Sequence, residues 1–202
     1  MAAIVTFRKF EERDIDFIFK CKNDERLNTL TVGQNHPFTY EEAAQWVRNC
    51  MKGDRPDLKF WAICTNDESK RIIGWISLSQ IDGNNKSACF HGIVIGDPNY
   101  RDGAAWIESY LFILSYFFEK MSYNRLYGTY FPEHVMTKSI ANSVFFYTEG
   151  IYRQSAFKNG RFHDVVFASL LSSEYYEHKN KGEYTYNSIL KRLIKEIKNN
   201  KQ

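Results

Sequence analysis

Residues 87–106 carry the sequence SACFHGIVIGDPNYRDGAAW, and the prediction of the fold rests on them. Apolar and β-branched residues predict a strand over 87–95. Asp97 and Pro98 predict the turn that follows it. The residues from Trp106 to Met121 are apolar on nearly every side of a helix, which is typical of a buried helix. The stretch therefore predicts a strand, a turn and a buried helix in succession.

The turn also has the composition of an anion site. A helix N-terminus offers unpaired amides and the positive end of the helix dipole, which suit a pyrophosphate. Gly103, Ala104 and Ala105 would let such a group approach the backbone, and Arg101 would add a cation. An ordinary strand-to-helix turn with small packing residues explains the same sequence, so both interpretations stay open.

The elements predicted on either side of this stretch complete one mixed sheet. The predicted order is β-α-α-β-β-β-α-β-α-β-β, followed by a helix in the tail. Thr39 and Glu42 form a capping box that opens the second helix. Three consecutive antiparallel strands followed by crossover connections predict an α/β fold with a mixed sheet, of the α+β kind. The strands are expected at 4–10, 58–64, 72–81, 87–95, 125–131, 152–157 and 165–171, and the other helices at 14–23, 106–121 and 134–147.

Composition and charge exclude several classes of protein. The chain has 202 residues, of which 44% are hydrophobic and 16% aromatic, so it can bury a core and is not a disordered chain. The net charge is only +3, and no recognition-helix pattern is present, so no specific nucleic-acid partner is expected. No apolar run approaches 18 residues, so no membrane association is expected. Four distant cysteines without a CxxC pair predict free thiols, no metal and a cytoplasmic location.

The positive charge belongs to the tail. Residues 179–202 hold seven basic and two acidic side chains, a net +5, whereas the remainder is −2. Apolar residues recur there at spacings of three and four, which predicts an amphipathic helix. We therefore divide the chain into a domain at 1–177 and a basic helix at 178–202. The apolar stripe is expected to dock on the domain or on a second subunit of a homodimer, with its lysines solvated.

Taken together, the motifs resemble the GNAT superfamily of acyl-CoA N-acyltransferases over residues 4–175. The resemblance is to the branch that acetylates ribosomal-protein N-termini, polyamines and amino-sugar nucleotides. It implies an N-acetyltransferase that uses acetyl-CoA and transfers the acetyl group by direct attack of a primary amine of a small molecule or peptide. The motifs that carry it are Gly92–Asp97 with Tyr100-Arg101, Glu149-Gly150 with Arg153, and the hairpin Phe157–Val165, supported by Phe38–Trp46 and Ile72–Trp75.

The resemblance also implies a cofactor site, from which this sequence departs at three places. Trp106 stands where the phosphate loop usually has Gly or Ala, unless the loop is shifted by one residue. Ala141 stands where the family often has a general-acid tyrosine, and Phe145 where it has glycine. These departures favour the alternative of a degenerate domain that binds a ligand or partner without turnover. The expected CoA-binding residues are Val94, Ile95, Gly96, Arg101, Asp102, Gly103, Ala104, Ala105, Trp106 and His134.

Three residues are candidates for catalysis. His91 precedes the cofactor strand and titrates in the useful range, so it is the leading general base, with a hydrogen-bonded sheet histidine as the alternative. His134 begins a helix that faces the expected CoA and would touch the pantetheine or the thiolate, although an ordinary helix-start residue is the alternative. Tyr130 is a substitute acid or a core aromatic. A backbone amide of the strand at 93–95 would hold the developing oxyanion.

Two further residues are candidates for binding the acceptor amine. Asp164 follows the hairpin turn at 158–161, where a carboxylate that stabilises the turn is the alternative. His36 lies in the loop between the first two predicted helices, where a solvated histidine is the alternative.

Overall fold

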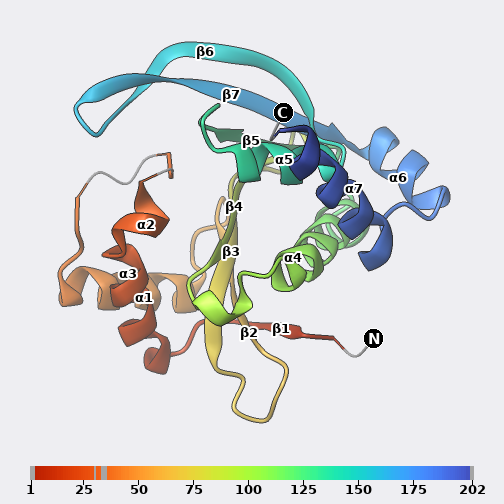
Figure 1. Cartoon of the computed structure of the whole chain (residues 1–202). Helices are drawn as coiled ribbons and strands as arrows, with labels where there is room; N and C mark the ends of the chain where they lie inside the picture. The colour runs from red at the N-terminus through yellow and green to blue at the C-terminus, as the bar shows by residue number, and fades with distance from the viewer. Residues whose placement is uncertain (1–2, 30, 33–35, 201–202) are drawn as a thin grey trace.

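A seven-stranded sheet in the order β1-β2-β3-β4-β5-β7-β6 runs through the molecule (Figure 1). The computed structural model describes residues 3–29, 31–32 and 36–200. Neighbouring strands are antiparallel except β4 and β5, which are parallel, so the predicted mixed sheet is confirmed. The strands are β1 (Val5–Arg8), β2 (Lys59–Thr65), β3 (Ile72–Asp82), β4 (Ser87–Ile95), β5 (Arg125–Tyr130), β6 (Tyr147–Lys158) and β7 (Arg161–Leu171).

Helices cover both faces of the sheet. Alternate residues of β2 point to opposite faces, so Ala62 and Cys64 face one hydrophobic cluster and Ile63 faces the other. The first cluster packs against α1 and α3, and the second against α4, α5 and α7. The α-helices are α1 (Ile15–Lys22), α2 (Glu25–Asn28), α3 (Tyr40–Lys52), α4 (Ala104–Ser115), α5 (Val135–Ser143), α6 (Ser172–Asn180) and α7 (Tyr186–Asn199).

The predicted capping box fixes the start of α3. The Thr39 hydroxyl accepts a hydrogen bond from the Glu42 amide at 3.2 Å. The Glu42 carboxylate accepts one in return from the Thr39 amide at 2.7 Å. Each side chain thus satisfies an amide that the helix itself leaves unpaired. The helix α3 packs on the same face of the sheet as α1 through its apolar side.

The parallel strands β4 and β5 separate soon after they meet. The residues that pair are Ser87–Cys89 with Arg125–Tyr127, and further along β4 and β5 do not pair with each other. On its other side β4 has a bulge, because Phe90 pairs with Leu78 whereas Ile93 pairs with Ile76. Gly92 lies inside this bulge at a φ of +92°, which glycine adopts without strain. The separation and the bulge create the space for a site at the centre of the sheet.

Several elements differ from the sequence prediction, among them β6 and β7, which begin at Tyr147 and Arg161 instead of residues 152 and 165. The helix α4 ends at Ser115 and is followed by a π-helical turn at Tyr116–Lys120. The helix α5 ends at Ser143 because Phe145 takes a φ of +67°, which no helix can continue through. An unpredicted helix, α6, follows β7 directly, and its Tyr175 stacks on Phe118 at 4.6 Å.

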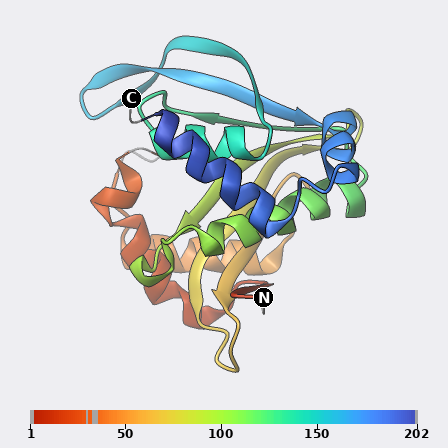
Figure 2. The ribbon, with the colours of Figure 1, turned by 45° about the vertical axis from the view of Figure 1, so that its right-hand side comes forward.

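The tail helix α7 docks on its own domain, which confirms one of the two predicted arrangements. Figure 2 shows α7 lying across α4 and α5. Ile189 and Leu193 are buried in this contact. The Arg192 guanidinium donates to the Ser143 carbonyl at 2.8 Å, and the Asn142 amide donates to Glu196 at 2.9 Å. The lysines at 191, 195 and 198 are exposed, as predicted for the solvated face.

The thiol and membrane predictions can be compared with the structure. All four cysteines are free thiols, as expected. Among the helices that the structure describes, none combines the length and the apolarity that crossing a bilayer requires.

Replacing Gly74 by alanine is expected to destabilise the domain by about 1–3 kcal/mol. A Cβ at this position would lie 2.1 Å from the Val94 carbonyl oxygen, which belongs to the backbone of β4 and cannot turn aside. Urea unfolding measures the change. Gly83→Ala is the control, because its Cβ would meet only the Tyr123 hydroxyl at 3.4 Å. Equal midpoints for the two variants would contradict the expected strain.

Candidate active site

A cavity of about 520 Å³ lies where β4 and β5 have separated. Its walls come from both strands, from the first turns of α4 and α5, from α2 and the residues after it, and from α7. This volume is typical of small-molecule sites. Past Cys89, β4 has a pairing partner on one side only, so alternate backbone amides of this strand point into the cavity.

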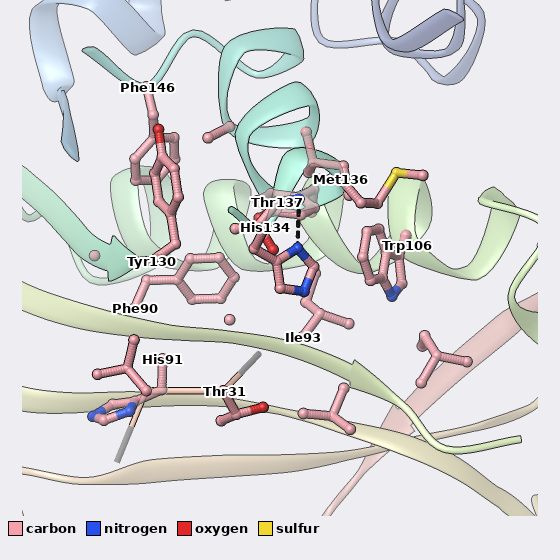
Figure 3. Close-up of a pocket in the computed structure, with 18 of the residues that line it drawn as sticks. Thr31, Phe90, His91, Ile93, Trp106, Tyr130, His134, Met136, Thr137 and Phe146 are labelled. Carbon is pink, nitrogen blue, oxygen red and sulfur yellow. Dashed lines mark hydrogen bonds between the residues drawn. The ribbon is translucent and has the colours of Figure 1, made fainter. Parts of the chain in front are cut away.

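His134 both caps α5 and lines the cavity. Its Nδ1 accepts a hydrogen bond from the Thr137 amide at 3.1 Å, shown as the dashed line in Figure 3. Burial lowers the pKa of its imidazole, so the ring is neutral at neutral pH. Because Nδ1 is an acceptor, the proton of the neutral ring is on Nε2. His134 can therefore donate a hydrogen bond into the cavity.

His91 lies on the other side of β4. Figure 3 shows it with Thr31 below the strand, whereas His134 and Trp106 lie above it. Burial lowers the pKa of His91, and the nearby Lys22 ammonium lowers it further. His91 lines the cavity, and within the described residues no hydrogen bond to its ring is found. His91 is therefore a neutral imidazole that is open to the cavity.

Lys22, which influences His91, is held among three aromatic rings. Its ammonium nitrogen lies 5.0 to 5.5 Å from the ring centres of Phe38, Trp46 and Trp75. Burial lowers its pKa, and the faces of the rings offset part of that cost by attracting the cation. The sequence analysis missed this cluster, because its members come from α1, the loop before α3, α3 and β3, and no sequence spacing links them.

Tyr130 also lines the cavity, at the end of β5. Only 7% of the residue is exposed, and it pairs with Val166 of β7. It belongs to the hydrophobic cluster that includes Tyr110 and Phe146. The position suits a core aromatic that forms a wall of the site.

In the turn between β4 and α4, two residues that were expected to bind phosphate form hydrogen bonds to the backbone of the turn itself. The Arg101 guanidinium donates to the Ile95 carbonyl at 2.9 Å and to the Gly96 carbonyl at 2.8 Å. The Asp102 carboxylate accepts from the Ala104 amide at 3.0 Å. Both side chains line the cavity, but their polar atoms stabilise the turn. Arg101 thus holds the turn through two of its nitrogens while it also lines the cavity.

The other expected cofactor residues divide into two groups. Val94, Ile95, Gly103 and Trp106 line the cavity. Gly96, Ala104 and Ala105 do not, and the two alanines are buried in the core. Gly96 is small because α1 packs on it: a Cβ would lie 2.3 Å from Cys21 Sγ and 2.6 Å from a carbon of the Phe17 ring.

Trp106 narrows the cavity at the start of α4. Figure 3 shows its indole beside His134 and Met136. Gly103 has a φ of +101° and no side chain, so a ligand in the cavity can reach the backbone of the turn at this residue. A ligand that follows the turn must therefore pass along the indole.

The two candidate acceptor residues lie outside the cavity lining. The Asp164 carboxylate accepts from the Gln154 amide at 2.8 Å, where β6 bulges and Gln154 has a φ of +51°. It thus connects the two strands of the hairpin at the bulge of β6. The His36 ring lies beside Phe38, and its Nδ1 is 3.0 Å from the Pro37 carbonyl oxygen.

The sequence analysis missed the residues that line the cavity next to α2. Arg26, Leu27, Thr31 and Val32 line the cavity there. The Lys158 ammonium of β6 donates to the Thr31 carbonyl and so joins the hairpin to this wall. The two segments are more than a hundred residues apart in the sequence, and no local signal links them.

Comparisons with known proteins agree with this geometry. Residues 5–144 match the acetyltransferase (GNAT) domain family. The chain is 31% identical over 174 residues to an uncharacterised N-acetyltransferase, p20, of Bacillus licheniformis, covering 85% of this chain and 94% of that protein. It is 23% identical over 175 residues to the spermidine N(1)-acetyltransferase of Vibrio cholerae, covering 87% of this chain and 97% of that protein.

Solved structures share the fold. The spermidine N-acetyltransferase of Vibrio cholerae, in complex with CoA and spermine, superposes with a TM-score of 0.74 at 22% identity, over 85% of this chain and 98% of that one. The separated parallel strands, the bulge of β4 against β3 and the family match lead to one conclusion: the chain belongs to the GNAT acetyltransferase family.

Proposed function

We propose that this protein transfers an acetyl group from acetyl-CoA to the primary amine of a small molecule. The observation that carries the proposal is the pair of neutral histidines, one on each side of β4, beside the gap between β4 and β5. Direct transfer from a thioester to an amine needs a base on one side and a donor for the leaving thiolate on the other. The comparisons favour this enzyme over a domain without turnover, because the relatives are named N-acetyltransferases.

The residues present fit an acyl-CoA in most respects. The first turn of α4 leaves backbone amides unpaired by the helix, and Gly103 keeps the approach to them open. Asp102 already occupies the Ala104 amide, so a pyrophosphate would use the amides that follow it. A bound acyl-CoA supplies the activated thioester carbon.

The histidines divide the proton transfers between them. An amine is protonated at neutral pH and must lose a proton before it can attack. His91 accepts that proton, which makes the nitrogen lone pair available for attack, and the nitrogen loses a second proton to solvent after the carbon–nitrogen bond has formed. A backbone amide of β4 stabilises the charge on the carbonyl oxygen. His134 Nε2 donates a hydrogen bond to the thiolate as the carbon–sulfur bond breaks. A neutral imidazole is too weak an acid to give this proton away, so His134 acts as a donor that remains protonated.

The charges around the cavity favour an acceptor that is not a polycation. Asp102 is the one carboxylate among the described lining residues, and it caps α4 on the cofactor side. Arg26 lines the acceptor side, and Lys22 lies behind His91. Like charges repel, so a second ammonium group on the acceptor would find no counter-charge in the lining. The geometry thus supports a monoamine or an amine that carries an anionic group.

Acetyl-CoA at 100 times its Kd is expected to stabilise the protein by about 2.7 kcal/mol. Thermal unfolding with and without the ligand measures this as a rise of several degrees in Tm. No rise at millimolar CoA or acetyl-CoA would contradict the proposed function. Thiol release then tests turnover with each amine.

Spermidine is expected to give a kcat/KM at least tenfold below that of a phosphate-bearing primary amine such as an amino-sugar phosphate. Arg26→Glu is expected to reduce this preference, because it reverses a charge in the lining. Arg55→Glu is the matched control. Arg26 pairs with Asp24, and Arg55 likewise pairs with an aspartate two residues away, Asp57, but Arg55 lies outside the cavity lining. A preference for spermidine in the unaltered protein would contradict the proposed acceptor class.

A further inference from the structure

The tail helix α7 forms part of the wall of the active-site cavity. Leu193 and Ile197 line the same cavity as His134. The family match ends at residue 144, whereas α7 begins at Tyr186. The matched part of the chain therefore does not complete its own cavity, and an element beyond it supplies two of the lining side chains.

Three helices contribute to this wall in the same way. Residues four apart lie on one face of a helix, and each of α4, α5 and α7 turns such a pair toward the cavity. The side chains are mainly apolar and none is charged. Ala141 has a single side-chain carbon, so α5 leaves the cavity open toward α7. The pairs are Trp106 and Tyr110, Thr137 and Ala141, and Leu193 and Ile197.

The wall is fixed firmly enough to position a ligand. The Arg192 guanidinium donates to the carbonyls of Ser143 and Glu183, each at 2.8 Å, and lies 4.3 Å from the centre of the Phe145 ring. Further along α7, the Asn200 amide donates to Ser139 Oγ at 3.0 Å. The Arg192 contacts adjoin Leu193, and the Asn200 contact lies beyond Ile197, so the two lining side chains lie between anchored positions of α7.

The wall faces the cofactor side of the site. In Figure 3, Trp106, His134 and Met136 lie above β4, whereas His91 and Thr31 lie below it. The side chains from α7 share their part of the lining with α4 and α5, the helices that start on the upper side. A ligand segment in contact with α7 is therefore the one that runs from the β4–α4 turn toward the reacting carbon.

We propose that α7 is part of the acyl-CoA site and that Leu193 and Ile197 contact the pantetheine arm. The proposal rests on the function proposed above. Burying part of the arm against two aliphatic side chains strengthens binding of the cofactor. The acceptor amine, which binds on the other side of β4, does not contact them.

Leu193→Ala is expected to raise the Kd of CoA at least fivefold in calorimetry, and to raise the KM for acetyl-CoA while the KM for the amine changes less than twofold. Ile194→Ala is the matched control, because Ile194 is the next residue of α7, is 46% exposed and lies outside the lining. Its Kd for CoA should stay within twofold of that of the unaltered protein. Equal or tighter binding of CoA by Leu193→Ala would overturn the proposal.

Hydrogen exchange on the unaltered protein gives a second test that does not depend on a variant. Saturating CoA is expected to slow the exchange of amides at 189–199 at least fivefold, because the bound arm restricts opening of α7. Unchanged exchange in α7, with CoA shown to be bound, would overturn the proposal. A protein that does not bind CoA at all would instead contradict the proposed function, so the two failures can be distinguished.

Discussion

Replacing His91 by glutamine is expected to lower kcat/KM by about 10²–10⁴-fold, the usual contribution of a general base. Glutamine keeps a polar side chain at the bulge of β4 but cannot accept the proton of the attacking amine. Binding of CoA should not change, because His91 lies on the acceptor side of the strand. Thiol release gives the rate, and thermal unfolding with CoA gives the binding.

The same assignment fixes the pH dependence. His91 is active as the neutral imidazole, and both burial and Lys22 lower its pKa from the usual value near 6.5. Activity should therefore fall on acidification only below pH 6.5, once the imidazole takes up a proton. The His91→Gln variant should lack this acidic limb.

A second histidine serves as the control for this experiment. His36→Gln is expected to stay within about threefold of the unaltered rate, because His36 is exposed in a loop and does not line the cavity. A loss of activity in His36→Gln that equals the loss in His91→Gln would contradict the assignment of the base.

The stretch around β4 was predictable because its signals are local. The run of apolar residues fixes the strand, and the small residues after Asp102 fix the start of the helix within a few positions. The bulge was not predictable, because it depends on how β3 and β4 align: Leu78 faces Phe90 while Ile76 faces Ile93. The candidate base could thus be located in the sequence, but its exposure to the cavity could not.

The roles of Arg101 and Asp102 show a second limit of prediction from the sequence. Arg101 and Asp102 have the chemistry of ligand-binding residues, yet each has a backbone partner within six residues of itself. Composition alone does not tell whether a charged side chain holds its own turn or a ligand. His134 shows that one side chain can do both, because capping uses Nδ1 and leaves Nε2 for the cavity.

The departure at Phe145 is explained by the tail. A residue with a φ of +67° is normally glycine, and a phenylalanine there carries backbone strain. Its ring stacks on His178 of α6 at 3.5 Å and lies beneath Arg192 of α7. The sequence could suggest an amphipathic tail, but it could not link the tail to a phenylalanine 47 residues before Arg192.

Deleting residues 183–202 is expected to lower the free energy of unfolding by about 3–6 kcal/mol. The deletion removes Ile189 and Leu193 from the core, and burial of each such side chain contributes about 1.5–3 kcal/mol. It also removes Tyr184 and Arg192 from Phe145, which then keeps its strain but loses two of its three ring partners. Urea unfolding of the shortened chain measures the loss.

A variant with fewer charges tests whether the tail stabilises the protein through apolar docking or through its net charge. Lys191→Ala combined with Lys195→Ala removes two exposed charges and no buried contact, so its stability should change by less than about 0.5 kcal/mol. If that variant were destabilised as much as the shortened chain, charge and not docking would hold the tail in place. Apolar docking is favoured because Ile189 and Leu193 are buried. The lysines face solvent and interact weakly with the distant charges of the domain.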